Sequence, residues 1–198
     1  MSNPPDSKIR IAVVIGTVRP GNYTSKAAAL VAAELASNSK IEVDVIDPAT
    51  MNLPFPGQQV DNPSSAELQE RIGKATGIVL TTPEYHGSVS SALKCLIENL
   101  GFPSELAGKP VALLGVAAGV IGAIKSLEQL RSICSHVGAI VLPGPVSVAG
   151  VQRVFNEAGE CTDAGVEQRV RSVATTLVDY IERSICPSVT LERMARDG

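Results

Sequence analysis

Residues 16–26, GTVRPGNYTSK, place an arginine and several hydrogen-bonding side chains between an apolar segment and an alanine-rich one. The apolar segment predicts a β-strand and the alanine-rich segment predicts a helix. The N–H groups and the positive dipole end of that helix would then face any ligand above the loop. Arg19 adds a planar charged donor, and Gly21 permits an unusual backbone angle. These groups together predict a phosphate-binding site. The residues expected to form it are Gly16, Thr17, Arg19, Asn22, Tyr23 and Thr24.

Three other interpretations of this loop can be weighed. A helix cap alone needs one side chain, such as Thr24, whereas the loop carries five groups able to bind an anion. The loop of ATP and GTP hydrolases has a lysine after its second glycine, but Asn22 follows Gly21 here. A dinucleotide fingerprint needs glycine at position 18, where valine stands, although Asp47 mimics its ribose-binding acid. The pattern therefore favours a phosphate site of another kind.

A second loop, TTPEYHGS, has the residues expected around a flat heterocycle. Pro83 stiffens the chain, Gly87 lets it turn close to a ligand, and Tyr85 can pack against a ring while main-chain groups bind its edge. His86 is either a proton donor or, as is commoner for one histidine in a loop, a packing residue. Glu84 is either a solvated charge or a residue that acts through its backbone. The predicted contacts are Thr82, Pro83, Glu84, Tyr85, His86, Gly87 and Ser88.

A third loop, GVAAGVIG, starts at residue 115 and has three glycines and no charged residue. Such small residues would let a planar ligand lie against the backbone, and they equally fit a tight turn from a strand into a helix. The candidate contacts are Gly115, Ala117, Ala118 and Gly119.

Alternating strand and helix patterns must position these loops. Four segments are apolar almost throughout, as in parallel strands covered on both faces, and a fifth alternates apolar with acidic residues, as in an edge strand. The predicted strands are 9–16, 41–47, 77–82, 110–117 and 139–144. The predicted helices are 24–37, 64–74 with a capping box of Ser64 and Glu67, 90–100, 124–137, and 163–183 capped by Asp163. A β-α unit repeated five times predicts an α/β sandwich of three layers, with ligands bound at the carboxyl ends of the strands.

Composition limits the remaining possibilities. The 198 residues predict one domain over 8–184, with residues 1–7 and 185–198 as flexible or peripheral ends. The net charge is −3 and the basic residues are scattered, which argues against a nucleic acid partner. Apolar runs are shorter than the roughly 20 residues of a membrane span, and the start MSNPPDSKIR has no secretory apolar core, so we expect a cytoplasmic protein. Four separated cysteines and two histidines indicate no metal site.

The loops together resemble those of the NAD(P)H-dependent FMN reductases of flavodoxin-like fold, a family that includes bacterial quinone, azo-dye and chromate reductases. The family's phosphate loop, approximately G-[ST]-x-R-x-x-S-x-N, is matched by Gly16, Thr17 and Arg19, with Asn22 and Thr24 in place of its serine and asparagine. Its second signature, approximately T-P-E-Y-x-x-S followed by L-K-x-x-I-[DE], is matched by Thr82, Pro83, Glu84, Tyr85, Ser88, Leu93, Lys94, Ile97 and Glu98. His86 replaces an asparagine that is usual after the tyrosine. The resemblance covers residues 8–183.

The resemblance implies a five-stranded parallel sheet of order 2-1-3-4-5 and FMN as cofactor. The FMN phosphate would lie in the first loop, one edge of its ring on residues 82–88, and its other side near residues 115–119. NAD(P)H, with NADPH favoured, would pass hydride to FMN, which would reduce a quinone, a free flavin, an azo compound or chromate. No side chain need act as acid or base. The resemblance also implies a homodimer or homotetramer.

Three alternatives stay open. A flavodoxin-type electron carrier would bind FMN without accepting hydride, although such carriers are usually more acidic than a net charge of −3. A flavin-supplying reductase of a two-component monooxygenase would release the flavin as its product. A relative without cofactor would act as a binding or regulatory subunit, which the near-complete first and second loops disfavour.

Overall fold

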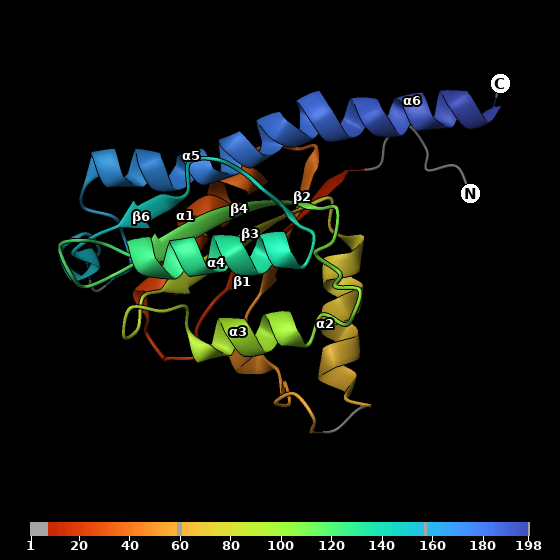
Figure 1. Cartoon of the computed structure of the whole chain (residues 1–198). Coiled ribbons are helices and arrows are strands. Elements are labelled where there is room, and N and C mark those ends of the chain that lie inside the picture. The colour runs from red at the N-terminus through yellow and green to blue at the C-terminus, as the bar shows by residue number, and fades with distance from the viewer. Residues whose placement is uncertain (1–7, 59–60, 157, 198) are drawn as a thin grey trace.

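A parallel β-sheet with helices on both faces forms the body of the molecule (Figure 1). The computed structural model describes residues 8–58, 61–156 and 158–197, so the predicted end at residues 1–7 lies outside the described part. The strands pair in the order β2-β1-β3-β4-β5, which confirms the predicted order, and β6 also pairs with β4. The strands are β1 (Ile9–Ile15), β2 (Ile41–Ile46), β3 (Gly77–Pro83), β4 (Pro110–Val116), β5 (Ile140–Val141) and β6 (Val146–Val148).

The two faces of the sheet have separate cores because successive side chains of a strand point to opposite sides. Ile11 and Val13 of β1 pack with α1 and α5, whereas Ala12 and Val14 pack with α2, α3 and α4. The three layers follow from this alternation. The helices are α1 (Tyr23–Ala36), α2 (Pro63–Lys74), α3 (Ser91–Glu98), α4 (Ile124–His136), α5 (Ala164–Tyr180) and α6 (Cys186–Asp197), with short 3-10 helices at Pro48–Thr50 and Val151–Arg153.

The fifth position of the sheet holds two short strands where one strand over 139–144 was predicted. β5 pairs with the start of β4 and β6 pairs with its end. Between them lie Pro143 and Pro145, which cannot donate ladder hydrogen bonds, and Gly144 with a φ of 74°. The prolines break the strand, so that the chain returns to the sheet only at Val146.

Helix α2 begins one residue earlier than the predicted capping box. The side chain of Asn62 accepts hydrogen bonds from the N–H groups of Ser64 (2.9 Å) and Ser65 (3.2 Å). Pro63 occupies the first helical position, where its missing N–H carries no penalty. The cap is therefore Asn62, and the assignment of Ser64 was wrong.

The chain after α5 is helical, whereas the sequence predicted only a flexible or peripheral end. Residues Ile181–Ile185 form a π-helix that leads into α6. Helix α6 extends past the sheet (Figure 1), and its Leu191 and Met194 are exposed. Pro187 argues against a helix in the sequence, but it lies in the first turn of α6, where proline is tolerated.

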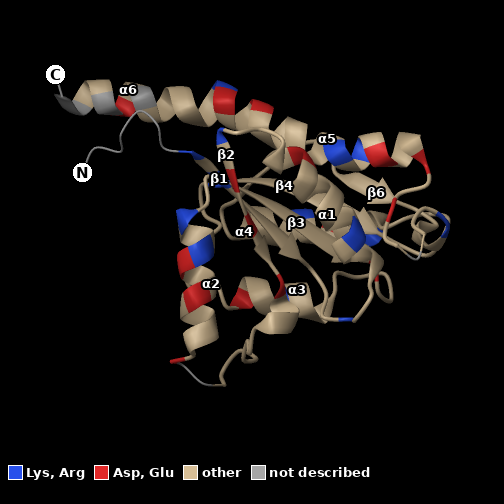
Figure 2. Cartoon of the chain, turned by 180° about the vertical axis from the view of Figure 1, so that it is seen from behind, with Lys and Arg blue, Asp and Glu red and all other residues tan. Residues whose placement is uncertain are grey.

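Charged residues of both signs lie beside one another along α2 and α5 (Figure 2). Several form ion pairs one helical turn apart, such as Arg71 with Glu67 and Arg171 with Glu167. This mixture differs from the basic stripe of a nucleic acid binding surface. Over the described residues, none of the helices has both the length and the apolar character needed to traverse a bilayer.

Candidate functional site

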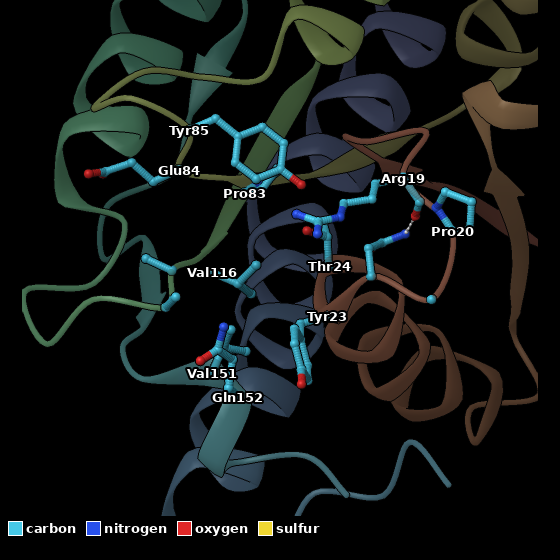
Figure 3. A pocket seen from close by; sticks show the side chains of 14 residues that line it. Arg19, Pro20, Tyr23, Thr24, Pro83, Glu84, Tyr85, Val116, Val151 and Gln152 are labelled. Carbon is cyan, nitrogen blue, oxygen red and sulfur yellow. Dashed lines mark hydrogen bonds between the residues drawn. The ribbon is translucent and has the colours of Figure 1, made fainter. Parts of the chain in front are cut away.

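A cavity of about 310 Å³ lies beyond the carboxyl ends of β1, β3 and β4, a size typical of ligand pockets. The order of the strands reverses between β1 and β3, which is where parallel sheets bind their ligands. Figure 3 shows the side chains around it. The lining residues are Arg19, Pro20, Gly21, Asn22, Tyr23, Thr24, Pro83, Glu84, Tyr85, Val116, Ala117, Ala118, Val151 and Gln152.

The first loop is shaped by Asn22, which is the N-cap of α1. Its Oδ1 accepts the N–H of Ser25 at 2.7 Å, and its Nδ2 donates to the carbonyl of Arg19 at 2.7 Å. Asn22 thus closes the loop as well as capping the helix. The N–H groups of Tyr23 and Thr24 have no partner among the described residues. Two free donors at a helix start are suited to an anion.

Arg19 is exposed, and it forms no ion pair with any residue that the structure describes. Its side chain extends from the first loop toward the cavity (Figure 3). The buried Thr17 accepts the N–H of Arg19 at 3.3 Å, which fixes the backbone beneath the guanidinium. Arg19 is therefore free to pair with an incoming anion.

Gly16, Thr17 and Thr82 do not line the cavity but support its loops from below. A Cβ at Gly16 would lie 1.9 Å from the carbonyl oxygen of Thr81, so only glycine fits there. The hydroxyl of Ser90 donates to the Gly16 carbonyl. Thr82 is buried and donates to the carbonyl of Pro83 at 2.8 Å.

The second loop makes a tight turn after Glu84. Tyr85 and Ser88 exchange backbone hydrogen bonds of 3.1 and 3.0 Å, and between them His86 and Gly87 have φ angles of 52° and 70°. Two positive φ angles define the hairpin turn that favours Asn-Gly, and histidine is among the residues that tolerate this conformation. The departure from asparagine at position 86 is therefore a substitution within a turn. His86, Gly87 and Ser88 lie outside the cavity lining, whereas Pro83, Glu84 and Tyr85 contribute to it.

Glu84 contributes its backbone to the cavity and sends its carboxylate elsewhere. Its N–H donates to the carbonyl of Val116 at 2.9 Å, which joins the second loop to the end of β4. The carboxylate points away from the cavity (Figure 3) and accepts the N–H of Ser126 in α4 at 3.1 Å. Glu84 is thus not a solvated loop charge.

The third loop contributes Ala117 and Ala118, while its glycines have other roles. A Cβ at Gly115 would lie 2.6 Å from the Cβ of Ala123, so this glycine allows α4 to pack closely. The carbonyl of Gly119 accepts the N–H groups of Gly122 and Gly150.

Five lining residues were not among the predicted contacts. Two of them, Val151 and Gln152, come from the segment after β6, where the N–H of Val151 donates to the carbonyl of Ala117 at 3.0 Å. The signal that could have revealed them is the sequence PGPVSV, where Pro-Gly-Pro breaks the strand and an alternating strand follows. The other three are Pro20, Gly21 and Val116, which adjoin predicted residues.

The comparisons with known proteins agree with this geometry. The profile of the family described as NADPH-dependent FMN reductase matches residues 9–153. The chain belongs to this family. It is 30% identical to a quinone reductase of Escherichia coli over 185 residues, which cover 89% of this chain and 97% of the relative. It is 31% identical to an NADPH azoreductase of Bacillus sp. strain OY1-2 over 177 residues, covering 88% and 96%.

The fold has a solved counterpart in the flavoenzyme NAD(P)H:(acceptor) oxidoreductase FerB of Paracoccus denitrificans. The two structures superpose with a TM-score of 0.73 at 24% sequence identity, covering 88% of this chain and 97% of that one. This likeness and the strand order confirm the predicted flavodoxin-like sandwich. The family assignment likewise confirms the resemblance drawn from the first two loops.

Proposed function

We propose that this protein is an NAD(P)H-dependent oxidoreductase that binds FMN in the cavity and reduces a small acceptor. The observation that carries the proposal is the pairing of an open anion site with a largely uncharged cavity wall. Arg19 and the free N–H groups at the start of α1 form the first, and Pro83, Val116 and Ala117 belong to the second. The family assignment and the names of the relatives support the same function.

The described residues fit FMN. Its phosphate would supply a negatively charged partner for Arg19 and for the N–H groups at the start of α1, which have none among the described residues. Its ring would lie between Tyr85 of the second loop and Ala117 and Ala118 of the third, where small and aromatic side chains leave room for a planar group. FMN, when bound, supplies the acceptance and release of hydride.

The protein's part is to bind, orient and exclude water. The backbone of the second loop orients the ring edge, because Glu84 and the turn after it are fixed by hydrogen bonds. No described acid or base side chain needs to exchange a proton, and His86 lies outside the cavity lining. We propose NADPH as the favoured donor, because the family description and the azoreductase both carry its name. The proposed acceptors are a quinone, a free flavin, an azo compound or chromate.

A homodimer or homotetramer completes the proposal. A groove of about 650 Å³ between α3 and α4 is bordered by Ile97, Ile133 and Phe102, and the Phe102 side chain is fully exposed. An apolar groove of this kind supports self-association. Light scattering on the eluting protein measures the mass directly, and a monomer at micromolar concentration would contradict this part of the proposal.

We also propose that the protein is located in the cytoplasm. Cys95, Cys134 and Cys161 are free thiols, which supports a reducing compartment.

One experiment separates the proposed function from its alternatives. The purified protein is saturated with FMN, freed of excess cofactor and mixed with NADPH without air. Rapid loss of the yellow colour supports the reductase, and a yellow protein that does not bleach supports an electron carrier. Failure to bind FMN would contradict both, and release of the flavin after reduction would support a flavin-supplying enzyme.

A further inference from the structure

The second loop is attached to helix α4 at two points. At the first, Oε2 of Glu84 accepts the N–H of Ser126 at 3.1 Å. At the second, Oε1 of Gln129 accepts the hydroxyl of Ser88 at 2.8 Å and the N–H of Val89 at 3.3 Å. These two attachments, which we call the α4 clamp, enclose the tight turn between them.

The start of α4 explains the first attachment. Ala123, the residue before the helix, has no side chain that could accept a hydrogen bond from the first turn. Its own N–H donates to the hydroxyl of Ser147 at 2.9 Å, and the N–H of Ser126 is left to Glu84. A carboxylate at this end of a helix also interacts favourably with the helix dipole. Glu84 thus supplies, from the end of β3, the cap that the sequence of α4 lacks.

The second attachment fixes the direction of the turn. The two backbone hydrogen bonds between Tyr85 and Ser88 lie within the turn. They fix its shape but not its orientation relative to α4. Gln129 holds the far side of the turn against α4, while Glu84 holds the near side. The ring of Tyr85 borders the cavity between the two attachments, and the Glu84 carboxylate points away from it (Figure 3).

We propose that Glu84 and Gln129 are positioning residues, which hold Tyr85 and the neighbouring backbone in the place where they meet the edge of the cofactor. This inference rests on the proposed function, because it assigns the clamp to the FMN-binding loop. Neither side chain needs to touch the cofactor. Both act through a loop whose conformation is set before the cofactor arrives, which lowers the ordering cost of binding.

The first test measures backbone amide hydrogen exchange by NMR in the protein without FMN. Gln129→Met removes the oxygen that accepts both hydrogen bonds while keeping a similar size, and Gln129→Glu retains an acceptor oxygen. We expect Gln129→Met to speed exchange of the Val89 amide by about tenfold, and Gln129→Glu to restore most of the protection. Glu84→Met should do the same for the Ser126 amide, with Glu84→Gln intermediate because it keeps an uncharged acceptor. Glu128→Met, an exposed neighbour on α4, is the matched control.

The second test measures FMN affinity and the visible circular dichroism of the bound flavin at saturating FMN. Both methionine variants should bind FMN about tenfold more weakly, as expected for the loss of one hydrogen-bonding anchor, and should alter the dichroism. The conservative variants should return both readouts toward the wild type. Glu128→Met should change neither.

Two results would overturn the positioning role: unchanged exchange in the methionine variants, or faster exchange with FMN affinity and dichroism equal to those of the wild type. If Glu84→Met fails to fold, Gln129→Met decides the matter alone. A wild-type protein that binds no FMN overturns the proposed function and the clamp's role at a cofactor. The exchange rates would still report whether the clamp exists, so the two failures are distinguishable.

Discussion

Helices α1 and α4 both begin at the carboxyl edge of the sheet, yet their first turns are capped by groups of different charge. At α1, Asn22 caps one N–H group. The N–H groups of Tyr23 and Thr24 have no partner in the described part of the chain, and the neighbouring Arg19 forms no ion pair there. At α4, the N–H groups of Ile124 and Lys125 likewise have no partner among the described residues, but the N–H of Ser126 is capped by the carboxylate of Glu84, a negatively charged group in place of the neutral Asn22 amide. The start of α1 thus has a neutral cap beside an arginine, whereas the start of α4 has a negatively charged cap. We therefore expect the charge of the capping group, and not the position at the sheet edge, to decide which helix start accepts a phosphate.

Gly16→Ala should cause the largest loss of stability, because the loop before α1 could no longer pack so closely against the sheet. The new Cβ would lie 1.9 Å from a backbone oxygen of β3, which cannot move aside as a side chain can. We expect a loss of about 3 kcal/mol or more in the free energy of unfolding, measured by urea denaturation.

Gly21→Ala is the matched control for this change. Its Cβ would meet nothing within 4 Å, and only its φ of 63° is strained, so about 1 kcal/mol is expected. Equal losses at the two glycines would contradict the packing role of Gly16.

Arg19→Ala should weaken FMN binding by about 10- to 100-fold, because it removes a charge-assisted contact to the phosphate. The melting temperature of the protein without FMN should hardly change, since Arg19 is exposed and forms no ion pair with the described residues. Isothermal titration with FMN measures the affinity. Lys125→Ala removes the cation at the start of α4 instead. A comparable loss of FMN affinity in this variant would contradict the proposed difference between the two helix starts.

Asn22→Ala should cost both stability and affinity at the open helix start. About 1 kcal/mol of stability is expected from the lost cap, and FMN affinity should fall several-fold because the Arg19 carbonyl loses its donor. Asn22→Asp sharpens the comparison, because aspartate can still cap Ser25 but adds a negative charge beside the phosphate. Its unfolding free energy should fall less than that of Asn22→Ala, because the cap to Ser25 is kept while the bond to the Arg19 carbonyl is lost, and its FMN affinity should fall. Loss of stability without loss of affinity in both variants would show that the loop only caps a helix.

His86→Asn should have the smallest effect. Asparagine suits the positive φ of position 86 better than histidine, so a gain of a few tenths of a kcal/mol in stability is expected. FMN affinity should stay within about twofold, since His86 lies outside the cavity lining. A large drop in turnover with NADPH would instead assign His86 a part in the reaction.

Local patterns in the sequence predicted most of the fold and nine of the fourteen residues that line the cavity. Apolar strands and capped helices are encoded in neighbouring residues, and Asp163 does cap α5 through the N–H of Val166. The cap was wrongly assigned to Ser64 because asparagine and serine both cap helices and Asn62 lies only two residues earlier. Pro63 between them distinguishes the two, because proline favours the first helical position.

The remaining features depend on contacts distant in sequence. Gln152 reaches the cavity because two prolines divide the fifth strand and β6 then pairs with β4. The prolines are visible in the sequence, but that pairing is not. The role of Glu84 depends on an N–H group 42 residues away. Gly16 and Gly115 were predicted as contacts of a ligand. In the structure, Gly16 allows the chain to pass close to β3, and Gly115 allows α4 to pack close to β4.

The most direct test of the open helix start compares FMN with riboflavin, which has the same ring and no phosphate. Titration of the wild-type protein and Arg19→Ala with both ligands gives four dissociation constants. We predict that the wild type binds FMN about 100-fold or more tightly than riboflavin, and that Arg19→Ala loses most of this preference while its riboflavin affinity is unchanged. Equal binding of FMN and riboflavin by the wild type would contradict a phosphate site at the start of α1.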